Sequence, residues 1–255
     1  MREPAFFQEV RDNAAKRWDQ LDADPELAAP WHQLFRQVQS PRHVLSELLQ
    51  NADDAGATAA AVRVENSQFI FTHDGEDFAP DHFSSICRFG YSNKRSLHTI
   101  GFRGIGFKSA FSLGDEVKLR TPTLSVIFHS RRFTEPVWED MVTETVELTT
   151  ISVSLRDALI VTEISKTLRD WQASPLSLLF FKNIRKLTVG DEELRWESLG
   201  PGPAPGSEWM ALNGRVEEPH LLARSASEPF PKDALEGTAY IVNTMRAIFE
   251  ELYNR

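Results

Sequence analysis

The chain has a single cysteine, Cys87, among its 255 residues, so an internal disulfide framework is excluded. This cysteine usage is typical of proteins from a reducing compartment, and we expect a cytoplasmic protein. The longest apolar runs are too short to span a bilayer, so a membrane protein is not expected. A basic-then-apolar leader after Met1 is also missing, so no secretory signal is expected.

Positive charge is scarce as well. Lys and Arg number 28 against 37 Asp and Glu, for a net charge of −9, which argues against a general nucleic-acid binder. The seven His show no metal-ligand spacing, and a Gly-x-Ser-x-Gly elbow is missing, so a histidine-based metal site and a serine hydrolase are unsupported. The content of 41% apolar and 25% charged residues is that of an ordinary soluble domain with a sizeable core.

The most informative stretch that is present is Glu47 to Ala55, ELLQNADDA. Glu47, Asn51 and Asp54 stand at i, i+4 and i+7, which in a helix places an acid, an amide and a second acid on one face. Such a row can hold a hydrated magnesium ion, because Mg²⁺ prefers oxygen ligands and meets the protein through one or two groups plus phosphate oxygens. The alternative is a surface helix with solvated polar groups.

A glycine-rich run follows at Gly101 to Asp115, GFRGIGFKSAFSLGD. Glycine allows a ligand to approach the main chain, and a glycine run that opens a helix offers free N–H groups to phosphate. The pattern is neither the dinucleotide-binding fingerprint nor a P-loop. A flexible linker is the alternative, although Ile105, Phe107, Ala110 and Phe111 give an apolar face at helical spacing.

Between these two motifs lies Phe69 to Phe78, FIFTHDGEDF. Phe69 to Phe71 predicts the end of a strand, and His73-Asp74-Gly75 predicts a turn. A polar turn with glycine after a strand is a common position for groups that recognise a ligand.

The order of the three motifs resembles the GHKL ATPase superfamily of gyrase, the ninety-kilodalton heat-shock chaperone, histidine kinases and mismatch-repair ATPases. The chain is most similar to the sacsin-like branch of chaperone-type ATPase domains, to which SLLFFKNIRKLTV at 177–189 adds a further similar segment. The resemblance covers roughly residues 40 to 190. It implies ATP and Mg²⁺ as ligands.

The resemblance also implies roles for single residues. Glu47 matches the general base that activates the water attacking the γ-phosphate, and Asn51 matches the magnesium ligand. Asp54 matches an Asp that supports the adenine or its bound water, and Gly75 matches the Gly that lets the adenine approach the backbone. The other positions matched to ATP contacts in and before the glycine run are Lys94, Gly101, Gly104, Ile105, Gly106, Phe107 and Lys108. For Lys108 a solvated or sheet-covering side chain is an equal alternative.

Two positions depart from the family's pattern. His73 stands where many members have the Asp that accepts from the exocyclic amine of adenine. Either the acceptor nitrogen of a neutral His73 takes the amine proton, or Asp74 reaches the base through a shifted turn. The family's late Gly-Thr pair is represented by Thr149 or Thr150 without the Gly, and strand alternation with Ile151 favours Thr149.

The fold class that we predict is α+β: a two-layer sandwich of a mixed, largely antiparallel sheet covered on one face by helices. An N-terminal helical arm spans 1–40, the ATP-binding domain spans 41–190, and 191–255 forms a C-terminal extension with a loop and a terminal helix. Residues 81–99 are expected to form a lid, for which an ordinary solvated loop is the alternative. The arm is expected to pack on the domain or on a second copy, which would make a homodimer.

Two functions follow from the resemblance. The first is an ATPase whose slow, Mg²⁺-dependent hydrolysis drives a conformational or dimerisation cycle with a protein partner or client. The second is an ATP-gated interaction module with little or no hydrolysis, which the absence of a clear transducer domain favours. A degenerate fold that serves as a scaffold is a third and weaker reading.

Overall fold

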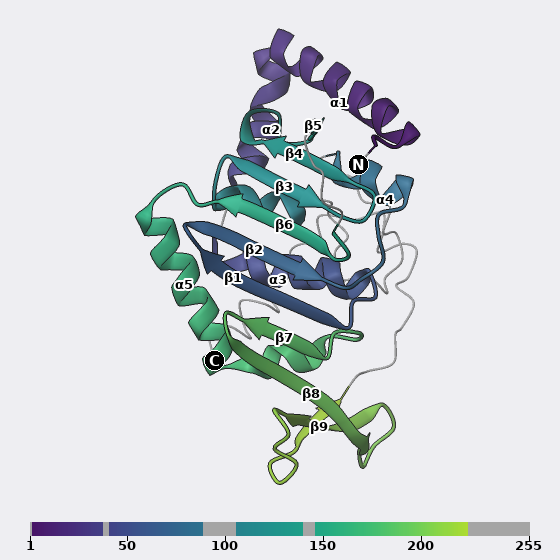
Figure 1. Cartoon of the computed structure of the whole chain (residues 1–255), viewed down its shortest axis with the longest axis vertical. Helices are drawn as coiled ribbons and strands as arrows, with labels where there is room; N and C mark the ends of the chain where they lie inside the picture. The colour runs from purple at the N-terminus through teal and green to yellow at the C-terminus, as the bar shows by residue number, and fades with distance from the viewer. Residues whose placement is uncertain (1, 38–40, 89–105, 140–145, 224–255) are drawn as a thin grey trace.

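The computed structural model describes residues 2–37, 41–88, 106–139 and 146–223 (Figure 1). Its helices are α1 (Ala5–Ala23), α2 (Pro25–Gln37), α3 (Pro41–Asp54), α4 (Pro80–Ile86) and α5 (Ala158–Ala173). Its short 3-10 helices are η1 (Gly106–Ser112), η2 (Ser130–Arg132) and η3 (Pro175–Phe180). None of the helices in these ranges is both long and apolar enough to cross a membrane.

The strands form one ten-stranded sheet in the order β10-β9-β8-β7-β1-β2-β6-β3-β4-β5. The strands are β1 (Ala59–Glu65), β2 (Gln68–His73), β3 (Glu116–Arg120), β4 (Ser125–His129), β5 (Pro136–Trp138), β6 (Thr149–Ser154), β7 (Lys186–Val189), β8 (Glu192–Pro201), β9 (Ser207–Leu212) and β10 (His220–Ala223). β1 and β7 are parallel, whereas the neighbouring pairs on either side are antiparallel. The predicted mixed, largely antiparallel sheet is therefore confirmed.

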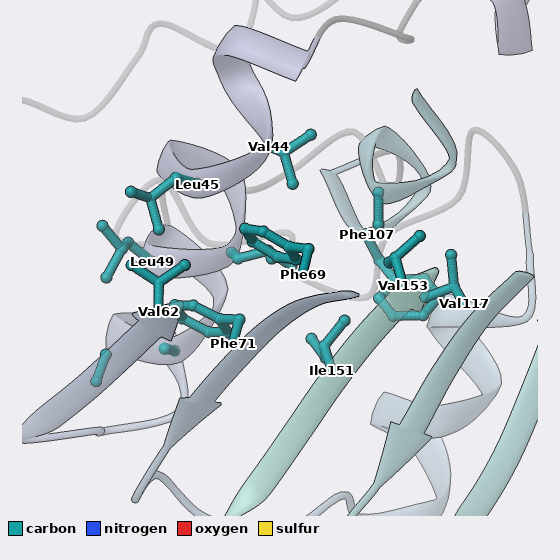
Figure 2. Close-up of a cluster of buried hydrophobic side chains, with 14 of the residues drawn as sticks. Val44, Leu45, Leu49, Val62, Phe69, Phe71, Phe107, Val117, Ile151 and Val153 are labelled. Atoms are coloured by element: carbon teal, nitrogen blue, oxygen red, sulfur yellow. The ribbon is translucent and has the colours of Figure 1, made fainter. Parts of the chain in front are cut away.

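The core lies between the middle of this sheet and α3, which runs behind β1 and β2 in Figure 1. Alternate residues of the strands are buried, among them Phe69 and Phe71 of β2 and Ile151 of β6, and they face Leu45 and its neighbours on α3 (Figure 2). Burying a large apolar side chain contributes about 1.5–3 kcal/mol. These buried side chains therefore supply much of the free energy that holds α3 to the sheet.

The β1–β2 hairpin sets the register of the central strands. Its two-residue loop, Asn66-Ser67, has φ values of 49° and 58°. Two positive φ angles are those of a type I′ turn, whose twist matches that of the flanking strands. The hairpin places Ala60 opposite His73, and β2 in turn pairs His73 with Thr149 of β6.

The predicted N-terminal arm is confirmed as two helices that pack on the domain. Asp24 caps α2, because its carboxylate accepts from the N–H groups of Glu26 and Leu27 at 3.1 and 3.2 Å. Trp18 of α1 is buried, and its indole N–H donates to the Thr134 hydroxyl at 2.9 Å.

After residue 190 we predicted an extension with a loop and a terminal helix, and a loop does join β8 to β9 at residues 202–206, but the strands around it were not predicted. The described part of this segment forms three strands, β8 to β10, which continue the sheet. β8 alternates buried Leu194 and Trp196 with charged Glu193 and Arg195, a period-two pattern that the sequence contains. The predicted C-terminal helix lies outside the described residues.

Two smaller differences concern single elements. The apolar face at helical spacing after the glycine run belongs to the 3-10 helix η1 over Gly106–Ser112, and Ile105 lies outside the described ranges. Segment 177–189 is strand only from Lys186 onward, since η3 occupies its beginning.

Candidate functional site

The predicted acid–amide row of α3 faces the glycine-rich segment. A Cβ atom added to Gly106 would lie 2.5 Å from Glu47 Oε2 and 3.4 Å from Asn51 Nδ2. Both side chains are half-buried. The backbone of Gly106 therefore touches the side chains of the predicted base and the predicted magnesium ligand, and a larger residue there would displace Glu47.

The end of α3 carries two acids with different surroundings. Asp54, the predicted adenine-side residue, is half-buried at the last position of the helix. Asp53 is buried, and its carboxylate accepts from the backbone N–H groups of residues 182–184 at 3.0, 2.7 and 2.9 Å. Asp53 therefore ties α3 to the segment before β7. This interaction of Asp53 was not predicted from the sequence. The only indication of it is the pair Lys182-Asn183, which lies within the segment 177–189 noted above.

His73 ends β2 with its side chain on the buried face of the sheet, where 7% of the residue is exposed. Its Nδ1 accepts from the Gly75 N–H at 3.2 Å. Burial lowers the pKa of His73 to about 4, against a smaller opposite effect of Asp74, so the ring is neutral at physiological pH. In a neutral ring whose Nδ1 is an acceptor, Nε2 carries the proton.

Both carboxylate oxygens of Asp74 are engaged by the start of β1. Its Oδ1 accepts from the N–H groups of Thr58 and Ala59 at 2.8 and 2.9 Å, and its Oδ2 accepts from the Thr58 hydroxyl at 2.6 Å. Burial raises the pKa of Asp74, but these hydrogen bonds outweigh burial and hold it below its usual value. Asp74 therefore clamps the loop before β1 to the end of β2.

Gly75 lies where the turn after β2 meets the end of α3. A Cβ atom there would come within 2.9 Å of the Ala55 carbonyl oxygen and 3.0 Å of His73 Nδ1. The next residue, Glu76, donates its N–H to that same Ala55 oxygen at 2.9 Å. A side chain at position 75 would push this turn off the helix, so glycine is required by close approach rather than by its φ angle.

Thr149 stands beside His73 on the neighbouring strand, and the strand register predicted from alternation is confirmed by its burial with Ile151 and Val153. Only 2% of Thr149 is exposed. Its hydroxyl has no hydrogen-bond partner in the part of the chain that the structure describes. A buried hydroxyl without a partner costs about 1–3 kcal/mol, so a ligand or a water that bonds to it would recover that energy.

Phe107 and Lys108, both matched to the ATP site, are buried. The Phe107 ring meets Phe128 with the centroids 5.2 Å apart. The Lys108 ammonium donates to the Ile86 carbonyl oxygen of α4 at 2.5 Å, and burial lowers its pKa to about 8 while Cys87 opposes that shift. The side chain thus connects the glycine segment to the last turn of α4, and a solvated Lys108 is ruled out.

Cys87 itself is buried, and burial raises the pKa of its thiol to about 12, which fits a packing residue rather than a nucleophile. Four residues matched to the ATP site lie outside the described residues: Lys94, Gly101, Gly104 and Ile105.

The donor set fits a magnesium ion that is shared with phosphate better than a metal held by protein alone. Across the described ranges, no three His, Cys, Asp or Glu side chains gather as metal ligands. One amide oxygen from Asn51, with water and phosphate oxygens, is a set that Mg²⁺ accepts. No model of a known protein family matches the chain.

Proposed function

We propose that the chain binds ATP together with Mg²⁺ and hydrolyses it slowly. The observation that carries the proposal is the contact of the Gly106 backbone with Glu47 and Asn51. This contact brings together two sequence motifs that lie about fifty residues apart. It provides a carboxylate that can activate water and an amide oxygen that can bind the metal.

Each residue of the proposed site would have its own role. Glu47 would accept a proton from the attacking water, and Asn51 would hold Mg²⁺, which neutralises charge on phosphate oxygens when bound. His73, Gly75 and Thr149 would receive the base at the end of β2. As the resemblance implies, hydrolysis would drive a conformational or dimerisation cycle in the cytoplasm with a protein partner or client.

A second candidate is an ATP-gated interaction module with little hydrolysis. It is favoured by Lys108, whose ammonium lies on the Ile86 carbonyl. Its charge is therefore directed at α4, whereas fast phosphoryl transfer usually needs a cation directed at the phosphate.

Calorimetry of ATP binding with and without Mg²⁺ tests the proposal. Asn51→Ala should weaken Mg²⁺-dependent binding at least tenfold, whereas Gln50→Ala, the neighbouring position on α3, should leave it unchanged. The proposal is wrong if the wild type binds no nucleotide.

Phosphate release separates the two candidates. Glu47→Gln should keep ATP binding and lower turnover by about 100-fold or more, since a general base contributes 10² to 10⁴. A wild type that binds ATP but shows no turnover above the Glu47→Gln variant would support the gated module instead.

A further inference from the structure

The hydrogen-bonding pattern of His73 determines which purine edge suits the end of β2. Its Nδ1 is already occupied by the Gly75 N–H, and the ring is neutral. The free polar atom is therefore Nε2–H, a donor. No hydrogen bond from Nε2 to another residue is found in the described part of the chain.

Two acidic residues of the turn, Asp74 and Asp77, accept hydrogen bonds from the chain itself. Both oxygens of Asp74 are engaged by Thr58 and Ala59. Asp77 accepts from the Phe78 N–H at 2.7 Å and from the Thr123 hydroxyl at 2.7 Å. Each oxygen of these two carboxylates therefore already accepts a hydrogen bond within the chain.

The Thr149 hydroxyl, also at this position, does not distinguish one purine base from another. The Thr149 hydroxyl, on the strand paired with His73, has no partner among the described residues. A hydroxyl can both donate and accept, so it adapts to either a keto oxygen or an amine. Among His73, Asp74, Asp77 and Thr149, only His73 therefore distinguishes a keto oxygen from an amine.

We propose that His73 reads the six-position of a bound purine as a hydrogen-bond donor, so that keto purines such as hypoxanthine bind at least as tightly as adenine. The inference rests on the proposed nucleotide site. The six-oxygen of hypoxanthine accepts from Nε2–H. The six-amine of adenine places a donor against a donor, and a mismatched buried pair is costly because both groups have lost water.

ITP and ATP provide the sharpest comparison, because their bases differ only in the six-substituent and in the proton on N1. Calorimetry of both with Mg²⁺ and the wild-type chain should give ITP a dissociation constant equal to or below that of ATP. GTP tests in addition whether the two-amino group is tolerated. Tighter binding of ATP than of ITP by the wild type would overturn the inference and leave the proposed function standing.

Two substitutions whose new side chains are isosteric with each other isolate the effect of the hydrogen-bond donor. In His73→Asn the amide oxygen can accept from Gly75 while its NH₂ remains a donor, so the order of ITP and ATP should be kept. In His73→Asp only acceptors remain, and preference should reverse to ATP by about tenfold or more. The same ratio of the ITP and ATP dissociation constants in both variants would contradict recognition of the six-substituent by residue 73.

Folding and function are controlled separately. Thermal unfolding of each variant shows whether it is folded, and the wild-type comparison needs no variant. Failure of ITP, GTP and ATP alike to bind the wild type would contradict the proposed function, and the inference with it.

Discussion

Two buried threonines show how differently two regions of this molecule are built. Thr134, 1% exposed, accepts from the Trp18 indole and joins the N-terminal arm to the domain. Thr149, 2% exposed, has no partner within the described ranges, although it lies in the middle of the sheet beside His73. The threonine of the arm is satisfied within the protein, whereas the threonine beside His73 has a hydroxyl that could still bond to a ligand or a water.

The contrast extends to the neighbours of each threonine. Around the arm, Phe35 stacks on Phe133 with centroids 4.0 Å apart, and Arg132 pairs with Asp19 and Glu135 at 2.9 Å each. At the end of β2, Gly75 lies against the Ala55 carbonyl oxygen and His73 Nδ1, and the Nε2–H of His73 has no partner among the described residues. A buried hydroxyl without a partner costs stability, so Thr149 is a physical argument for a ligand at this place, although Ser112 and Trp196 also carry such buried polar atoms elsewhere in the described ranges.

The largest expected effect on stability comes from removing the buried contact between the N-terminal arm and the domain. Trp18→Ala should destabilise the chain by about 3–5 kcal/mol, because it removes a fully buried aromatic side chain and leaves Thr134 unpaired. Urea unfolding measures the loss. Leu27→Ala on the same arm is the control, since Leu27 is 52% exposed and its truncation should stay within about 0.5 kcal/mol. Equal losses would show that the arm does not depend on its buried face.

Acidification should weaken the other region next. The pKa of His73 is about 4 in the folded chain, below an unfolded value near 6.5. Between these values the unfolded chain binds the extra proton, so stability is complete above pH 6.5 and falls as the pH drops toward 4. The loss should be about 2 kcal/mol at pH 5.

Urea unfolding at pH 7, 6 and 5 measures this loss. The non-titrating His73→Asn variant is the control, because other acid-sensitive groups remain in both chains. If the two stability curves run parallel between pH 7 and 5, His73 is not the group responsible.

Filling the closest contact of the proposed site should have an intermediate effect. Gly106→Ala would place a methyl group 2.5 Å from Glu47 Oε2, and such overpacking costs about 1–3 kcal/mol. If the proposed ATPase function holds, turnover should fall along with it, because Glu47 must move. A Glu47→Ala background removes the clash, so Gly106→Ala should cost much less there. Additive losses in the double variant would place the strain elsewhere.

The smallest effect tests the threonines themselves. Thr134→Val should cost about 1–2 kcal/mol, since it leaves the Trp18 N–H unpaired, whereas Thr149→Val should be neutral or stabilising by up to about 1 kcal/mol. Urea unfolding compares the two directly. A loss at Thr149 as large as that at Thr134 would mean that its hydroxyl is bonded in solution without a ligand.

Much of this architecture was predictable because its signals are local. The acid–amide row of Glu47 and Asn51 follows helical spacing, and the register of Thr149 follows strand alternation. Both needed only the sequence nearby, and both were correctly placed.

What the sequence did not reveal depends on distant partners. Asp53 looks like any polar residue until residues 182–184 supply its three donors. The donor character of His73 depends on a backbone N–H whose direction no residue pattern encodes. β8 to β10 were missed although β8 alternates, because these strands gain stability from pairing with one another rather than from their own sequence.

The parallel pairing of β1 with β7 has a consequence for how the chain reaches this structure. Ala59 pairs with Lys186, so one edge of the central β1–β2 hairpin has to wait for a strand made much later in synthesis. A contact of such long range closes slowly, and an open strand edge is a template for association with other chains. The nascent chain therefore has a period in which the β1 edge of its central hairpin is unpaired, and folding yield should depend on how quickly β7 is made and pairs with it.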